Sequence, residues 1–134
     1  MNKTIKSALF VCLLAFFLVA CKKDSATPGA AEKILGTWTL QSDIYHQYVG
    51  GTDYSDTTLG MGTTFKFASD GTASIEIPGQ GTTSSVYYLT GDTKITIGGT
   101  NNYDIKTLTS NALVLYSKHE QGADYYEETI SLNK

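Results

Sequence analysis

Apolar and polar residues alternate along most of the chain after residue 34. Large apolar side chains occupy every second position in short stretches, such as Phe65 and Phe67 around Lys66, or Ile95 and Ile97 around Thr96. A period of two is typical of β-strands with one face turned to a core. Turn residues punctuate these stretches at intervals of about ten residues, and no segment keeps a helical period over three turns. The pattern therefore predicts an all-β domain.

Eight strands are expected, at residues 34–46, 62–69, 72–78, 84–90, 93–98, 102–109, 112–118 and 123–132. Asp-Gly and Gly-Asp pairs favour tight hairpins, so consecutive strands should be antiparallel neighbours. Eight hairpin-linked strands are enough to close an up-and-down barrel. Ile105 and Leu108 differ in parity, which predicts a bulge near Lys106 and Thr107. The stretch 86–89 is apolar on both faces and leaves its register open.

The first 21 residues form a separate pattern. Lys3 and Lys6 precede an apolar run from Ala8, and the run closes on Leu18-Val19-Ala20-Cys21. The run is too short to span a bilayer and is typical of a secretory signal peptide. Its end resembles the lipobox of bacterial lipoproteins. That resemblance implies removal of residues 1–20 and attachment of a diacylglycerol to Cys21. A plain signal peptide with an incidental cysteine is the alternative.

Residues 21–33 are predicted to form the lipidated cysteine and a flexible tether, because residues 22–33 contain no large apolar side chain. A membrane partner is then reached through the lipid anchor. Lys22 after the cysteine favours the outer membrane over the inner one. The Lys22-Lys23-Asp24 start also resembles lipoproteins of the Bacteroidetes, some of which face the cell surface. The expected location is the cell envelope, with the domain at 34–134 facing the periplasm or the exterior.

The composition limits which partners and which kinds of catalytic or metal site the chain could have. Without residues 1–20 the chain keeps eight lysines, no arginine and thirteen acidic residues, which argues against nucleic acid as a partner. Cys12 leaves with the signal peptide, so no free thiol remains beside the lipidated Cys21. His46 and His119 have no partners at metal-ligand spacing, and no nucleophile or phosphate-binding motif occurs. We therefore expect no enzyme activity, no metal and no cofactor.

A family resemblance covers residues 34–134. Gly36-Thr37-Trp38 on the first strand matches the Gly-x-Trp signature of lipocalins. Phe65-Lys66-Phe67 leading to Asp70-Gly71-Thr72, and Tyr103-Asp104-Ile105 followed by Leu113-Val114-Leu115, extend the likeness. Together they resemble the lipocalin-like domains of Bacteroidetes lipoproteins. The resemblance implies that Trp38 plugs the closed end of the barrel. The arginine that stacks on this tryptophan in lipocalins and their C-terminal helix have no counterpart here.

The candidate binding residues lie in a predicted loop and in the barrel interior. The segment 45–62 is expected to be a long loop that closes over the barrel mouth, with Tyr48, Tyr54 and Met61 as a lid. The alternative is that these side chains cover the barrel end and bind nothing. Trp38, Phe65, Phe67 and Tyr88 are assigned to the floor and wall. Glu128 points inward by parity, either to orient a ligand headgroup or to reach water at the rim.

The predicted lipid anchor, barrel and candidate binding residues are compatible with two functions. The first is a membrane-anchored envelope lipoprotein that binds a small, largely apolar ligand without catalysis. The alternative is a packed barrel that serves as a protein- or glycan-interaction module of the envelope. An apolar void inside the barrel would favour the first function. A filled interior with an exposed aromatic surface would favour the second.

Overall fold

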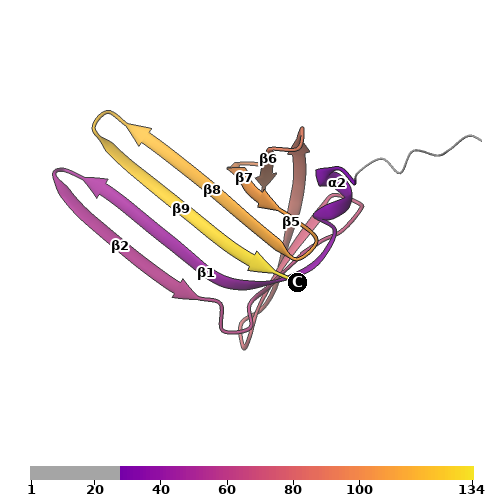
Figure 1. The fold of residues 1–134 in the computed structure, drawn as a ribbon. Coiled ribbons are helices and arrows are strands. Elements are labelled where there is room, and N and C mark those ends of the chain that lie inside the picture. Colours follow the sequence, from indigo (N-terminus) through magenta and orange to yellow (C-terminus); the bar gives the residue numbers. More distant parts are fainter. Residues whose placement is uncertain (1–27) are drawn as a thin grey trace, which may run out of the picture.

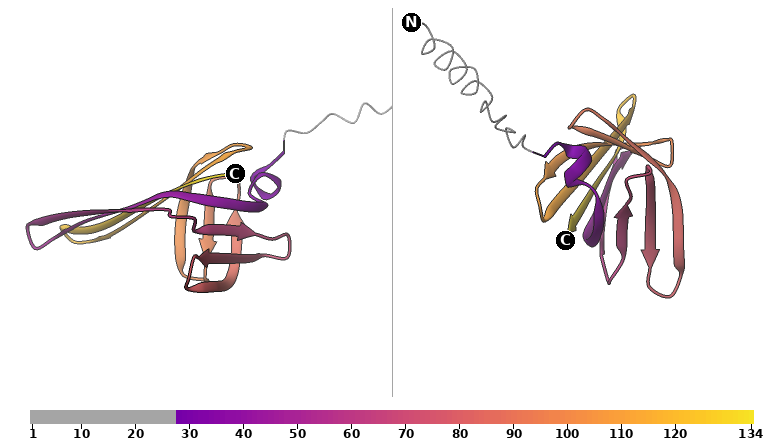
Figure 2. Two further views of the ribbon diagram at one scale, coloured as in Figure 1. Left: turned by 90° about the horizontal axis from the view of Figure 1, so that it is seen from below. Right: turned by 90° about the vertical axis from the view of Figure 1, so that its right-hand side faces the viewer.

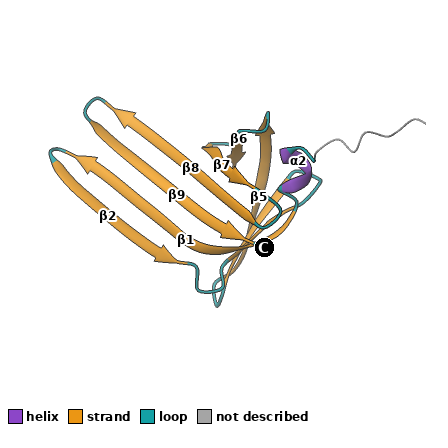
Figure 3. Ribbon diagram, in the orientation of Figure 1, coloured by secondary structure: helices purple, strands orange, loops and turns teal. Residues whose placement is uncertain are grey.

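The computed structural model describes residues 28–134, so the predicted signal peptide, Cys21 and the start of the tether lie outside the described residues. One helical turn and nine strands make up this part (Figures 1 and 3). Their bounds are α2 Ala30–Lys33, β1 Gly36–Val49, β2 Thr52–Leu59, β3 Thr64–Phe67, β4 Thr72–Ile77, β5 Gly81–Thr90, β6 Lys94–Ile97, β7 Asn101–Leu108, β8 Ala112–Gln121 and β9 Asp124–Asn133.

Eight of the strands close into an antiparallel up-and-down barrel. The order runs β1-β3-β4-β5-β6-β7-β8-β9, and β9 pairs with β1 to complete the ring. This confirms the predicted fold class and is compatible with a lipocalin-like fold. The predicted bulge is also present, because the register between β7 and β8 shifts between Ile105 and Thr107.

The barrel interior is filled by side chains from the predicted apolar positions. Trp38, Leu113 and Leu115 are fully buried. They belong to one core cluster, which also contains Ile34, Phe65, Phe67, Ala73, Ile95, Ile97, Ile130 and Leu132. Ile77 has the same parity as the buried Ala73 but is 39% exposed, because it lies in the last pair of the β4–β5 hairpin, opposite Gly81. Burial of these apolar surfaces is the main source of the domain's stability.

The predicted tether ends earlier than residue 33. Residues 30–33 form α2, and Ala30 and Ile34 are buried against the barrel. The backbone N–H of Ala30 donates to the Asp92 carboxylate at 3.1 Å, on the turn between β5 and β6. Composition alone predicted a flexible tether here, but Ala30 is small enough to be buried, and Ile34, about one helical turn later, belongs to the core cluster.

The largest departure from expectation is the segment 45–62. It is no loop: β1 continues to Val49, turns through Gly50 and Gly51, and returns as β2. Both glycines have positive φ (58° and 84°), as a tight type I′ hairpin turn requires. The same edge of β1 therefore pairs with two strands in succession. Residues Gly36 to Thr39 pair with β3, and residues Ser42 to Val49 pair with β2.

The ends of four strands leave the barrel together. Beyond the ring, β2, β1, β9 and β8 remain paired in that order and project away from the barrel body (Figure 2). We call this projection the arm and define it as residues 42–59 and 116–129. The arm is the main addition of this fold to a simple eight-stranded ring.

Candidate functional site: the arm and the cleft beside it

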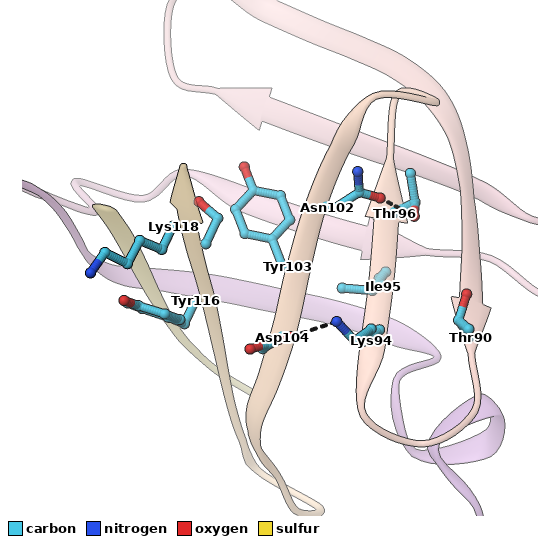
Figure 4. Close-up of a pocket in the computed structure, with 10 residues that line it drawn as sticks. Thr90, Lys94, Ile95, Thr96, Asn102, Tyr103, Asp104, Tyr116 and Lys118 are labelled. Carbon is cyan, nitrogen blue, oxygen red and sulfur yellow. Dashed lines mark hydrogen bonds and ion pairs between the residues drawn. The ribbon is translucent and has the colours of Figure 1, made fainter. Parts of the chain in front are cut away.

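A cleft opens where the arm leaves the barrel. β7 pairs with β8 only from Asp104 to Leu108, although β7 starts at Asn101 and β8 continues to Gln121. The start of β7 and the end of β8 are therefore not paired, and a cavity of about 460 Å³ lies there. Figure 4 shows the side chains that line it. A second cavity of about 340 Å³ adjoins it. Both are lined by Asn102, Tyr103, Ser117 and Lys118.

Nine of the ten side chains that line the larger cavity of this cleft carry a polar group. Ile95 is its buried apolar wall, beside Thr96, whose hydroxyl bonds to the Asn102 side chain at 2.7 Å. Lys94 and Asp104 form an ion pair across the β6–β7 hairpin at 3.4 Å, drawn as a dashed line in Figure 4. Such a lining suits a ligand with several hydrogen-bonding groups better than a hydrocarbon.

Two carboxylates and a tyrosine meet at the root of the arm. The Tyr103 hydroxyl donates to Glu128 at 2.9 Å. Burial, and the nearby Glu128 charge, raise the pKa of Tyr103, so this phenol remains a donor at neutral pH. Asp43 lies diagonally across from Glu128 on the same face of β1 and β9. Its Oδ1 atom is buried and has no hydrogen-bond partner among residues 28–134. Burial, and then repulsion from Glu128, raise the pKa of Asp43.

One face of the arm carries a network of charges and aromatic rings. Lys118 contacts Glu120 at 2.8 Å and Glu127 at 3.3 Å, and its ammonium lies 4.8 Å from the Tyr125 ring centroid. His46 bonds to Asp53 across the β1–β2 pair and lies 3.7 Å from Glu127. Tyr48 stacks on Tyr125 with centroids 5.8 Å apart. These contacts tie all four strands of the arm together.

The arm also presents apolar surface to solvent. On the face opposite the charge network, Tyr45 stacks on Tyr126 with centroids 6.5 Å apart. Six of the nine large hydrophobic side chains that are exposed lie on the arm or at its end, namely Ile44, Tyr45, Val49, Tyr54, Leu59 and Met61. Exposed apolar groups gathered on one projection are typical of a contact surface.

Charge is divided unequally between arm and barrel. Among residues 28–134 the arm carries seven carboxylates and a single lysine, Lys118. The rest of this part carries five carboxylates and five lysines, so its formal charge is balanced. The negative charge of the folded domain therefore resides on the arm, where it favours a cationic partner.

The structure separates the predicted site residues into two groups. Trp38, Phe65 and Phe67 lie in the packed core. Tyr48 and Tyr54 lie on the arm, and Met61 follows it with 89% of its surface exposed, so none of them lies in a loop lid.

Tyr88 does not line the barrel interior, because it is 51% exposed on β5. Its neighbour Tyr87 turns inward instead, with its hydroxyl donating to the Ala68 carbonyl at 2.9 Å and its ring edge-on to Phe67. Glu128 faces the predicted side and is partly buried beside Tyr103.

Sequence reasoning did not single out Asp43, Tyr103 or Lys118 as site residues. Tyr103 has the same parity as Ile105, but its contact with Glu128 joins strands that are far apart in sequence. Asp43 changes face because Gln41 forms a bulge in the pairing of β1 with β9, between Leu40 and Ser42. The available signal for that bulge was Ser42, a polar residue at the position where the alternation of Trp38 and Leu40 calls for an apolar one.

Comparisons with known proteins do not assign the chain to a family. No family model matches the chain, and no curated protein matches it. Within residues 28–134, no group of three or more His, Cys, Asp or Glu side chains is arranged to hold a metal ion. None of the helices described for this chain has the length and apolar character needed to cross a membrane.

Proposed function

We propose that this protein is an interaction module of the bacterial cell envelope, anchored through lipid on Cys21 and binding a basic protein partner with its arm. The observation that carries the proposal is the concentration of seven carboxylates and most exposed apolar side chains on one projecting sheet. Charged groups steer the encounter, and apolar and aromatic groups supply contact area. The clustered carboxylates favour a protein with lysines or arginines over a neutral glycan.

The packed barrel supports this choice over an internal apolar ligand. Trp38 and its core neighbours fill the interior, and the cavities lie at its margin with a polar lining. The Leu18-Val19-Ala20-Cys21 pattern supports the lipoprotein assignment and the expected envelope location. A lipid anchor would hold the barrel near the membrane and leave the arm free to reach a partner.

Photocrosslinking in intact cells tests this function. Tyr54 on the arm and Tyr88 on the barrel are both 51% exposed, so they form a matched pair for a photoreactive amino acid. We expect a discrete protein adduct from position 54 and none from position 88. Replacing Asp53 and Asp56 with lysine should abolish the adduct. Equal adducts at both positions, or an adduct that survives charge reversal, would contradict the proposal.

A second candidate function rests on the cleft. Cavities of about 460 and 340 Å³ that share Tyr103 and Ser117 are large enough for a small ligand with several polar groups. This is a more polar ligand than the sequence suggested. Native mass spectrometry of the intact protein would reveal it as a mass excess that disappears when the protein is denatured. An unchanged mass after incubation with an envelope extract would count against it.

A further inference from the structure

The outer edge of the arm is an exposed strand. Within residues 28–134, β2 pairs with β1 alone, and all eight of its residues are exposed. Natural proteins usually protect such an edge with charged side chains, above all lysine, or with proline, a bulge or a covering segment. The β2 sequence, Thr-Asp-Tyr-Ser-Asp-Thr-Thr-Leu, contains neither lysine nor proline, and its register with β1 runs without a shift.

The pairing fixes which backbone groups this edge offers. Val49 and Thr52 flank the two-residue turn, and pairs along an antiparallel ladder alternate between hydrogen-bonded and non-hydrogen-bonded. Odd-numbered positions of β2 consequently turn their N–H and C=O groups away from β1. Thr57 agrees with this, because its N–H donates to the Asp56 carboxylate at 2.9 Å. Asp53 and Ser55 offer the same groups to a new strand.

The negative charge of β2 determines which kind of strand could pair with its free edge. Asp53 and Asp56 lie on opposite faces of β2, and the strand holds no cation. A second copy of the chain would bring four such carboxylates into two adjacent strands, which is unfavourable. An extended segment with lysines or arginines would instead place a cation beside a carboxylate on either face. Cross-strand pairs of opposite charge stabilise a sheet, whereas like charges destabilise it.

We propose that β2 binds an extended, basic segment of a partner protein by β-strand addition, so that the segment becomes a further strand of the arm. This inference rests on the proposed function, since it specifies how the arm holds its basic partner. Main-chain hydrogen bonds to the Asp53 and Ser55 positions, and to the Thr57 carbonyl, would give the affinity, while the Thr57 N–H already donates to Asp56. Contacts of alternate side chains with Asp53 on one face, and with Tyr54 and Asp56 on the other, would give the specificity.

Synthetic peptides test the strand itself. The first probe is an eight-residue peptide that alternates lysine with valine. The second is the same peptide with alternate backbone amides methylated, which keeps the charge but blocks pairing. The third alternates glutamate with valine. Binding to the intact protein is measured by fluorescence anisotropy at low salt. We expect only the first probe to bind well, and methylation to weaken binding about tenfold.

Variants at Ser55 supply the matched control. Ser55→Pro removes an N–H that faces solvent and leaves the pairing with β1 intact, so the arm should remain folded. It should weaken the lysine peptide about tenfold, whereas Ser55→Ala should leave binding within about twofold. An unchanged His46 resonance would show that the β1–β2 pair survives in both variants.

The outcomes separate this inference from the proposed function. If the methylated peptide binds as well as the first and Ser55→Pro has no effect, strand addition is overturned, while Asp53 and Asp56 would still mark an electrostatic surface. If a two-fold dimer through β2 excludes the peptide, the basic partner is overturned as the occupant of this edge. If the crosslink at Tyr54 also fails, the proposed function falls with it.

Discussion

The Lys134 ammonium lies 4.5 Å from the centroid of the Trp38 ring. It also donates to the carbonyl oxygens of Lys33 and Leu35, at 3.1 and 2.8 Å. The indole N–H of Trp38 in turn donates to the Ile34 carbonyl at 2.7 Å. One cation thus joins the segment before β1, the buried tryptophan and the end of the chain. The cation that contacts this tryptophan is thus a lysine, where the resemblance to lipocalins implies an arginine.

Loss of this cation should loosen the packing between the segment before β1, Trp38 and Lys134. Lys134→Ala removes the cation–π contact and two hydrogen bonds, so we expect it to lower the free energy of unfolding by about 1 kcal/mol. Lys134→Arg should retain most of that stability, because guanidinium also stacks on aromatic rings. Urea unfolding followed by tryptophan fluorescence measures both. Lys66→Ala, at an exposed position on β3, is the control and should change little.

The barrel was predictable because its signal is local. Alternation of apolar residues with hairpin turns indicated the strand order, most of the core and the bulge near Thr107. The arm could not be read in this way. From Tyr45 to Leu59 polar and aromatic residues face solvent on both sides of the sheet, so no apolar period marks the strands. The Gly50-Gly51 pair was the remaining signal for a hairpin.

Gly60 ends β2 against the backbone of β1, and the chain passes there from β2 toward β3. A methyl group at this position would lie 1.7 Å from the Leu40 carbonyl oxygen. Gly60→Ala should therefore displace the backbone and cost about 3 kcal/mol of unfolding free energy. Thermal unfolding by circular dichroism measures the loss. Gly29→Ala is the control, because the added carbon would meet no atom closer than 3.7 Å; an equal loss there would contradict the argument.

The candidate site was less predictable than the fold. Parity placed Glu128 on the inner face, and the structure agrees. The partners of Glu128 come from β7 and from β1 beyond a bulge, and neither relationship follows from local sequence. The acidic character of the arm also required the structure, because its seven carboxylates come from two segments separated by more than fifty residues and are joined only by the pairing of β1 with β9.

Asp43→Asn should stabilise the protein at neutral pH. The pKa of Asp43 is raised by burial and by Glu128, so the folded protein holds this proton more tightly than the unfolded chain does. Stability should then fall as pH rises from the ordinary carboxyl value of about 3.9 through the raised value. Asparagine removes this cost, and we expect a gain of about 1 kcal/mol near pH 7.

Urea unfolding at a series of pH values across this range measures the free energy of unfolding of wild type and of Asp43→Asn. The two proteins should have similar stability below about pH 3.9, where Asp43 is protonated in both states, and should diverge above it. Glu76→Gln, at an exposed position on β4, is the control. A constant difference between wild type and Asp43→Asn at every pH would show that the buried charge is not the cause.

The pKa of His46 should report whether its hydrogen bond to Asp53, across the β1–β2 pair, is formed. Its hydrogen bond to Asp53 raises its pKa above the ordinary value of about 6.5, against a smaller opposing effect of burial, and Glu127 acts in the same direction as Asp53. The stabilisation is complete below that ordinary value and is lost as pH rises through the raised pKa. Titration by NMR should give a lower midpoint in Asp53→Asn than in wild type. Asp56→Asn removes the carboxylate on the other face of β2 and should leave the midpoint unchanged; an equal shift in both variants would indicate a general charge effect instead of the specific pair.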